Sequence, residues 1–267
     1  MQLKKGQIIE LDIQSMAFGG AGLGKYEIAG DKRGGLTVFV HGTMPGDKVR
    51  AAFTKIKSNF AEAKLVEVMS GSSDRVEARC PNFGVCGGCQ LQFMPYAKQL
   101  EMKQQQVIDA FERIGGFKNV PVLEIIGCEK SFYYRNKMEF SFGHDAEMQF
   151  SLGLHMPERK YDVLDVRECY LESELSVAIV NVVRDFVLEK GWKPYRISTG
   201  EGFLRSLYIL EGKRTGEVMI NLVTGENLPE GFENGLLEIV GILSRLGGPE
   251  KEITSIYWSK GISRRGQ

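Results

Sequence analysis

Three cysteines lie close together in the first third of this 267-residue chain. Cys80, Cys86 and Cys89 form a C-x5-C-x2-C pattern with glycines between them. Glycine lets the backbone wrap closely and leaves amide N–H groups able to point at sulfur. Three thiolates gathered by such a turn therefore predict a site for a soft metal centre rather than unliganded thiols.

A tetrahedral site needs a fourth ligand, and two cysteines remain. Cys169 stands between a predicted strand and a predicted helix, where its side chain can reach a loop. Cys128 is the alternative, although a lone cysteine after an apolar strand is usually a small buried hydrophobic residue. Zinc and an iron–sulfur cluster both accept four cysteines, so the residues alone leave the metal open. The odd total of five cysteines excludes a complete disulfide framework.

A second group of residues has the chemistry of a single-stranded RNA site. Lys55, Lys57 and Phe60 combine charge with an aromatic ring, while Arg135 and Lys137 follow the cysteine segment and could hold phosphates. The alternative is that these cations face solvent and that Phe60 is a core residue. The formal net charge is zero, which argues against simple electrostatic coating of nucleic acid.

Other motifs carry less chemistry. The glycine run at residues 19–24 lacks the last glycine of G-x-G-x-x-G and is better explained as a barrel turn. Asp162 and Asp165 near a strand end favour turn and surface roles over an acid–base pair. The three histidines, His41, His144 and His155, have no metal-ligand spacing and are taken as structural.

The first 70 residues have the pattern of a small β-barrel. Short apolar strands are predicted at residues 8–13, 37–40, 48–53 and 61–69, separated by glycine and proline turns. Such closely spaced strands favour an OB-like barrel. This part holds ten Lys and Arg against seven acids, which suits a polyanion-facing surface and an ordinary one equally well.

The rest of the chain first forms a two-faced helix at about 95–114 and then alternates strands with helices. Strands are predicted at 138–142, 149–154, 161–166, 204–210, 217–223 and 253–258, and helices at about 171–190 and 233–246. Short links between neighbouring strands favour an α+β domain with a mainly antiparallel sheet. No signal sequence or long apolar run is present, so a cytoplasmic location is expected.

Several segments, in this order and spacing, resemble the bacterial RNA (uracil-5-)-methyltransferases. The resemblance covers nearly the whole chain, and the Cys-Gly-Gly-Cys-Gln core followed by Tyr-Arg-Asn-Lys is specific to that family. The segments are Ala17 to Gly22, Val38 to Val40 with Pro45-Gly46-Asp47, Cys80 to Gln92, and Tyr134 to Met138.

The resemblance implies four parts of the chain. These are a TRAM-type RNA-binding barrel at 1–70, an iron–sulfur cysteine segment at 71–94, a helix at 95–116 that packs on a catalytic domain, and a central α+β domain at 117–267. It also implies a structural [4Fe-4S] cluster. Its ligands would be Cys80, Cys86, Cys89 and Cys169, which leaves Cys128 as a packing residue.

The same resemblance implies S-adenosylmethionine as methyl donor and RNA as partner. Ribosomal RNA is the expected substrate with transfer RNA as the open alternative, and the protein is expected to be a monomer. In that family a cysteine attacks C6 of the target uracil. We recognise no cofactor-binding or catalytic-cysteine motif in this sequence. We therefore expect an RNA-binding and iron–sulfur portion that lacks the catalytic domain and is inactive alone. The alternative is a non-catalytic iron–sulfur or zinc RNA-binding module.

Overall fold

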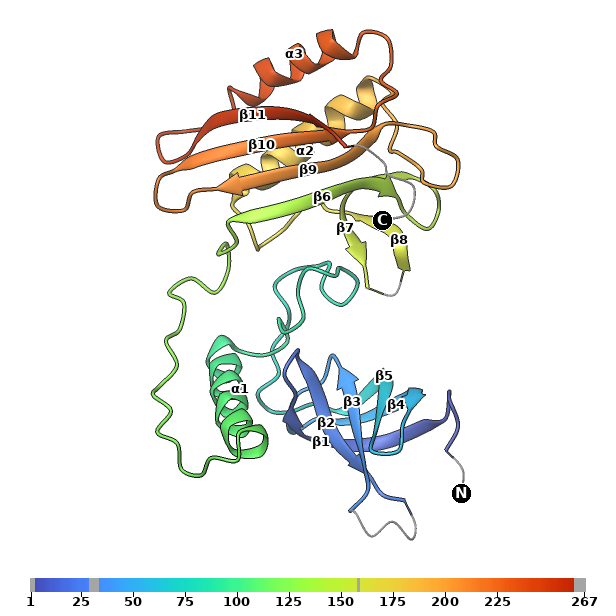
Figure 1. The fold of residues 1–267 in the computed structure, drawn as a ribbon, viewed down its shortest axis with the longest axis vertical. Helices are drawn as coiled ribbons and strands as arrows, with labels where there is room; N and C mark the ends of the chain where they lie inside the picture. The colour runs from blue at the N-terminus through green and yellow to red at the C-terminus, as the bar shows by residue number, and fades with distance from the viewer. Residues whose placement is uncertain (1–2, 29–33, 158, 262–267) are drawn as a thin grey trace. The chain divides into compact units, whose positions relative to one another are not determined.

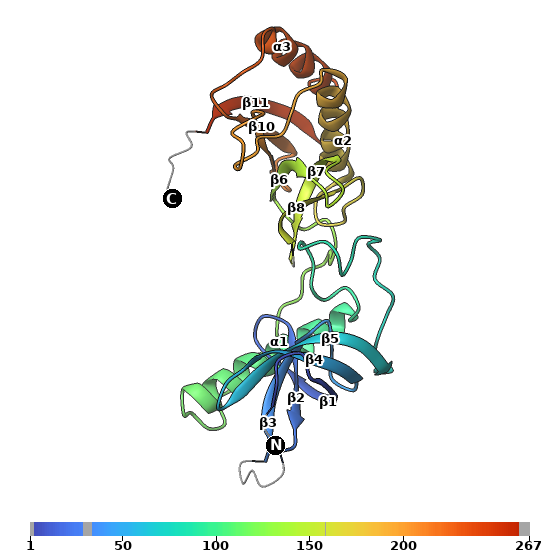
Figure 2. The ribbon, with the colours of Figure 1, turned by 90° about the vertical axis from the view of Figure 1, so that its right-hand side faces the viewer.

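The chain divides into two compact units. The computed structural model describes residues 3–28, 34–157 and 159–261 (Figures 1 and 2). The first unit contains residues 1–84 and 89–129, and the second contains residues 85–88 and 130–267. The chain thus crosses from one unit to the other and back within the cysteine segment.

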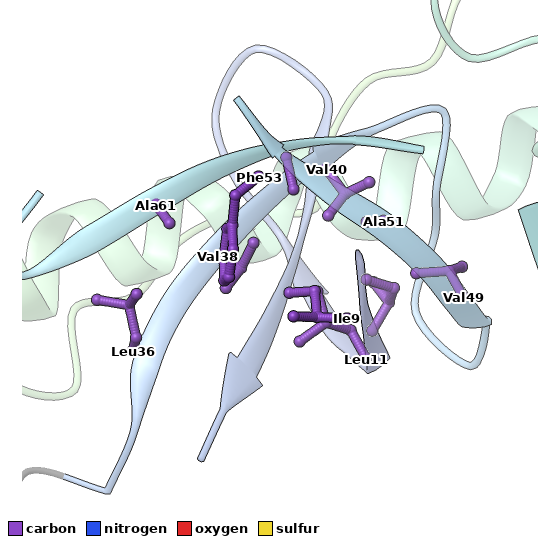
Figure 3. Close-up of a cluster of buried hydrophobic side chains, with 11 residues drawn as sticks. Ile9, Leu11, Leu36, Val38, Val40, Val49, Ala51, Phe53 and Ala61 are labelled. Carbon is purple, nitrogen blue, oxygen red and sulfur yellow. The ribbon is translucent and has the colours of Figure 1, made fainter. Parts of the chain in front are cut away.

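The first unit contains a closed five-stranded barrel, as the strand pattern predicted. The strands close in the order β1-β2-β3-β5-β4, with β3 and β5 parallel and the other neighbours antiparallel. Alternate side chains point inward, and Val38, Ala51 and Phe53 are almost completely buried in the barrel core (Figure 3). The strands are β1 (Ile8–Met16), β2 (Ala21–Tyr26), β3 (Leu36–His41), β4 (Lys48–Ile56) and β5 (Phe60–Ser70).

Strand β2 was not predicted, because its glycines indicated a loop. Only the beginning of the run is a turn: Gly20 has a φ of +86°, a conformation that glycine adopts without strain. The following residues pair with β1 and β3. A Cβ atom at Gly22 would lie 2.1 Å from the Thr43 hydroxyl oxygen, so glycine is needed there for close approach of two barrel segments.

A buried ion pair fixes the turn between β3 and β4. The Asp47 side chain is fully buried, and Arg75 donates to it twice, from Nε to Oδ1 at 2.9 Å and from Nη2 to Oδ2 at 2.8 Å. The backbone N–H groups of Met44 and Ser72 donate to the same carboxylate. Burial alone would raise the pKa of Asp47, but Arg75 and these N–H groups hold it below its ordinary value.

Helix α1 (Tyr96–Asp109) follows the cysteine segment and continues as a π-helical turn, η1 (Ala110–Ile114). None of its residues is fully buried. Gln106 nevertheless ties it to the barrel, because its side-chain amide donates to the carbonyl oxygen of Ala17 at 3.0 Å. Apolar side chains remain exposed at its end, where Ile114 is 88% exposed.

The second unit contains a six-stranded sheet in the order β11-β10-β9-β6-β7-β8, with α2 (Glu174–Glu189) and α3 (Phe232–Leu243) packed on it. The sheet is mixed: β10 and β11 are parallel, and the other neighbours are antiparallel. The parallel pair arises because α3 provides the crossover between these strands. The strands are β6 (Lys137–His144), β7 (Phe150–Met156), β8 (Arg159–Asp165), β9 (Leu204–Glu211), β10 (Glu217–Thr224) and β11 (Glu252–Lys260).

Arginine 184, on the buried face of α2, ties this helix to the sheet. Arg184 is 1% exposed, and its Nε donates to Asp165 at 2.6 Å while Nη2 donates to the carbonyl oxygen of Val166 at 2.6 Å. Asp165 is thus the partner of a buried cation, and Asp162 pairs with Arg159 at 3.7 Å. Within the described residues, no helix is long and apolar enough to cross a membrane.

Replacing Asp47 with Asn should lower the free energy of unfolding by about 3 kcal/mol, because Arg75 would lose its charged partner in a mostly buried setting. Since the folded pKa of Asp47 is depressed, its stabilisation is present above the ordinary carboxyl pKa and is lost as pH falls through the folded value. Urea unfolding at neutral and acidic pH measures both effects. The matched control is Asp12→Asn, at an exposed position in the same barrel. Equal losses in the two variants would contradict the assignment.

Candidate functional site

Cys80 and Cys89 belong to the first unit. The backbone N–H of Cys80 donates to the side-chain oxygen of Gln92 at 3.0 Å, so the two ends of the cysteine loop are joined. The segment after Cys89 is anchored next to the barrel by a small core. Four buried side chains form that core: Met16, Met44, Phe93 and Met94.

Cys86 belongs to the second unit with its neighbours at 85–88. The N–H of Gly88 donates to Cys86 Sγ at 3.3 Å, an amide-to-sulfur bond of the kind that stabilises thiolate ligands. A Cβ atom at Gly87 would lie 2.8 Å from the carbonyl oxygen of His155, so any side chain there would force a shift. The glycines therefore allow this segment to lie directly against β7.

Cys169 lies half-buried in the loop between β8 and α2, in the same unit as Cys86. Two features bring its loop near residues 85–88. The N–H of Arg135 donates to the carbonyl oxygen of Leu171 at 2.9 Å, and the Arg135 guanidinium reaches the carbonyl oxygen of Gly88 at 3.4 Å. Arg135 thus bridges the two segments that carry Cys86 and Cys169.

Cys128 differs from the expectation of a packing residue, because its side chain is exposed. The residues before it form no strand, so no apolar sheet buries it. Its backbone N–H donates to the Tyr96 hydroxyl at 2.8 Å, which holds this part of the chain along α1.

The four cysteines predicted as ligands are divided between the two units, two in each. Among the residues that the structure describes, no three Cys, His, Asp or Glu side chains form a group that could hold a metal ion. The donor chemistry fits an iron–sulfur cluster, since it offers thiolates and an amide hydrogen bond to sulfur. The ligand set stays a prediction from the sequence.

Lys55, Lys57 and Phe60 come together at the hairpin between β4 and β5. The Lys57 N–H donates to the Phe60 carbonyl oxygen at 2.9 Å, and the Lys55 ammonium lies 5.6 Å from the centre of the Phe60 ring. Lys55 also pairs with Glu62 at 2.6 Å, which offsets its charge. Lys57 is exposed as well.

Lys137 lies on β6, where its ammonium is 5.2 Å from the centre of the Tyr208 ring on β9. Sequence reasoning missed this tyrosine, because only the strand register reveals the pairing. It also missed Phe18, which is 89% exposed at the turn between β1 and β2. The available signal was a single aromatic residue directly before Gly19 and Gly20.

A buried carboxyl pair follows the Cys169 loop. Glu172 is completely buried, and neither of its carboxyl oxygens has a hydrogen-bond partner in the described part of the chain. Burial, together with the nearby charge of Glu211, raises the pKa of Glu172 to about 8. Glu172 is therefore protonated at neutral pH.

Glu211 has the opposite environment. Burial alone would raise its pKa, but Lys213 and Lys251 donate to Oε2 at 2.5 and 2.6 Å. The hydroxyls of Ser173 and Ser176 donate to Oε1. These four donors lower the pKa of Glu211 to about 2, so the pair holds a single negative charge at neutral pH.

Comparison with known proteins finds matches to the barrel and to nearly the whole chain. A family model for the TRAM domain matches residues 2–66. An uncharacterized RNA methyltransferase of Chlorobaculum tepidum is 35% identical over 95% of this chain and 53% of its own length. One of Clostridium tetani is 38% identical over 84% of this chain and 48% of its own length.

A solved structure is also similar to this chain. It is a Pyrococcus abyssi tRNA (uracil-54, C5)-methyltransferase in complex with S-adenosyl-L-homocysteine, with a TM-score of 0.63 and 25% identity over 97% of this chain and 52% of that one. The TRAM match, these relatives and this structure together support the resemblance of the chain to the RNA (uracil-5-)-methyltransferase family. It spans about half the length of the curated relatives that it matches.

The comparisons correct the expectation of an RNA-binding and iron–sulfur portion without a catalytic domain. Nearly all of the chain aligns with proteins named RNA methyltransferases and with a methyltransferase that holds S-adenosyl-L-homocysteine. The expectation rested on motifs not recognised in the sequence and on where the sequence ends, and neither establishes an absence. The expected inactivity of the chain, which depended on the missing domain, no longer follows.

Replacing Glu172 with Gln should remove a pH dependence of stability. The folded state keeps the Glu172 proton up to about pH 8, whereas the ordinary pKa is 4.5, so stability falls as pH rises between these values. The slope is at most about 1.4 kcal/mol per pH unit. Urea unfolding of the wild type between pH 5 and 8.5 should show this decline, and Glu172→Gln should flatten it. The exposed Glu174→Gln is the control, and a slope that persists in Glu172→Gln would refute the assignment.

Proposed function

We propose that this protein is an S-adenosylmethionine-dependent methyltransferase that modifies C5 of uridine in RNA. The observation that carries the proposal is the alignment of 97% of the chain with a tRNA (uracil-54, C5)-methyltransferase bound to S-adenosyl-L-homocysteine. S-Adenosylmethionine would supply the methyl group. Ribosomal RNA is the proposed substrate, and transfer RNA, the substrate named for the structural neighbour, is the alternative that the experiment separates.

RNA binding is assigned first to the barrel. The TRAM match covers it, and the exposed Lys57 lies in the same hairpin as the half-buried Phe60, whose ring centre is 5.6 Å from the Lys55 ammonium. A cation next to a ring suits a phosphate and an unstacked base. Lys55 is proposed as a weaker contact, because Glu62 already pairs with it. Lys137 is proposed as a phosphate contact, and Arg135 as a contact that also holds the cysteine segment.

A [4Fe-4S] cluster is proposed as the resident cofactor, with Cys80, Cys86, Cys89 and Cys169 as its ligands. The Gly88 N–H bond to Cys86 Sγ and the bridging by Arg135 support this set, whereas Cys128 is exposed. The cluster is assigned a structural role.

The proposed organisation is a TRAM domain at 1–70, a cysteine segment at 71–94, a helix at 95–116 and a central domain at 117–267. The helix carries exposed apolar side chains, Phe111 and Ile114 among them. We propose that they pack against another part of the monomeric enzyme.

A strain from which the gene is deleted should lose 5-methyluridine from ribosomal RNA and keep it in transfer RNA, because the proposed target of this enzyme is a uridine of ribosomal RNA. Mass spectrometry of nucleosides from the two purified RNA pools measures this, and re-introducing the gene is the control. Loss from transfer RNA alone would reassign the substrate. Unchanged 5-methyluridine in both pools would refute the proposed function.

Protein purified without oxygen should contain about four irons and four sulfides and should absorb visible light as an iron–sulfur protein does. Cys169→Ser should lose most of this iron, whereas the matched variant Cys128→Ser should keep it. Iron, sulfide and zinc analysis with visible spectra measures the outcome. A colourless protein with one zinc, or equal iron in the two variants, would overturn the cluster or its ligand set.

A further inference from the structure

The sheet of the second unit has one covered and one open face. Helices α2 and α3 pack on the same face (Figure 2), and side chains that point there, such as Phe140, Leu207 and Ile220, are 1% exposed or less. The side chains that alternate with them along β6, β9 and β10 are all partly or fully exposed. Among the described residues of this unit, none covers this second face of the sheet as α2 and α3 cover the first.

Strand register places these open-face residues in three rows across four strands. The central row contains two tyrosines, an asparagine and a glutamate, and the flanking rows contain small, polar or moderately apolar residues. The rows are Glu139, Tyr208, Asn221 and Tyr257; Lys137, Leu210, Met219 and Ser255; and Ser141, Ser206, Val223 and Ser259. Two hydrogen bonds of 3.0 Å confirm the shared face, from Ser259 to Asn221 and from Ser206 to Glu139.

The central row has the side chains that bind unstacked bases. Tyr257 is 55% exposed, and Tyr208 lies beside the Lys137 ammonium at 5.2 Å. One strand separates the two tyrosines, which puts them about 10 Å apart. Asn221 lies between them and offers both a donor and an acceptor to a base edge.

We propose that this open face binds a single-stranded segment of the substrate RNA. Tyr257 and Tyr208 each stack on a base, Asn221 contacts a base edge, and Lys137 neutralises a phosphate. The inference rests on the proposed function, since it assigns RNA contacts within the same enzyme. It adds a binding surface outside the TRAM barrel.

The chemistry of the face favours RNA over a protein partner or a second copy of the chain. The centre of a stable protein interface is depleted of charged residues, whereas the central row here contains Glu139 and lies beside Lys137. Glu139 is the one carboxylate in the three rows, and it already accepts a hydrogen bond from Ser206. Single-stranded RNA is favoured over a duplex, because stacking on tyrosine requires bases that are not already paired.

The test is fluorescence anisotropy of the 267-residue protein with a labelled oligouridylate of roughly 12 nucleotides. Tyr257→Ala should weaken binding by about 5- to 100-fold, the range for loss of one stacked base, and Tyr257→Phe should restore it because the ring is kept. Tyr161→Ala is the matched control, since Tyr161 is 80% exposed on β8 outside the rows. Circular dichroism establishes that each variant is folded.

A second measurement does not depend on a variant. Crosslinking of an oligonucleotide that contains 4-thiouridine, followed by peptide mapping, should label β9 or β11. Suppose that the wild type binds RNA, that Tyr257→Ala and Tyr161→Ala bind it as tightly as the wild type, and that the crosslinks are confined to the barrel. RNA binding by the open face is then refuted, while RNA binding by the protein stands. If the wild type binds no RNA, the proposed function fails together with the proposed role of the open face. Self-association that Tyr257→Ala abolishes would identify a second copy as the occupant and overturn the inference.

Discussion

The pairing of Asp47 with Arg75 is the constraint on which the first unit depends. A carboxylate with no exposed surface costs several kcal/mol to desolvate, so it persists only because two guanidinium bonds and two backbone N–H groups satisfy it. Arg75 begins the segment that leads to the cysteines, and its guanidinium lies 4.6 Å from the centre of the Phe93 ring, just beyond them. One ion pair in a barrel turn thus holds both ends of the cysteine segment.

The short apolar runs and the turn residues between them predicted the barrel, but not every strand. The four predicted strands are found with longer bounds, whereas β2 was missed because Gly22 and Gly24 weaken its apolar pattern. The need for Gly22 comes from Thr43, which approaches only after the barrel has closed. A requirement set by a residue about twenty positions away has no local signature. The burial of Cys128 was wrongly predicted for a related reason, since its neighbours form no strand.

Part of the candidate site was predictable from the sequence, and part of it depends on the fold. Spacing alone singled out the cysteine triplet, and residue type singled out Lys137. Only strand register makes Tyr208 a neighbour of Lys137 and places Tyr257 on the same face of the sheet. β6 and β9 are far apart in the sequence, and their pairing is fixed by the core on the helix side, where Phe140 opposes Leu207. A shift of one residue would exchange the two faces. The surface chemistry of this sheet is therefore specified by its buried side.

A formal net charge of zero is compatible with an RNA-binding protein, because the count treats all carboxyl groups alike. In the fold, Asp47, Asp165 and Glu211 are each held by buried or partly buried cations, and Glu172 is protonated at neutral pH. These acids contribute little negative potential to the surface that a polyanion meets. Each of these ion pairs also neutralises a cation, so the uncharged Glu172 alone makes the remaining charge more positive than composition suggests, and exposed cations such as Lys57 and Lys137 are left to meet the polyanion. With stacking on aromatic rings supplying part of the affinity, RNA binding by this chain does not require a strongly basic surface.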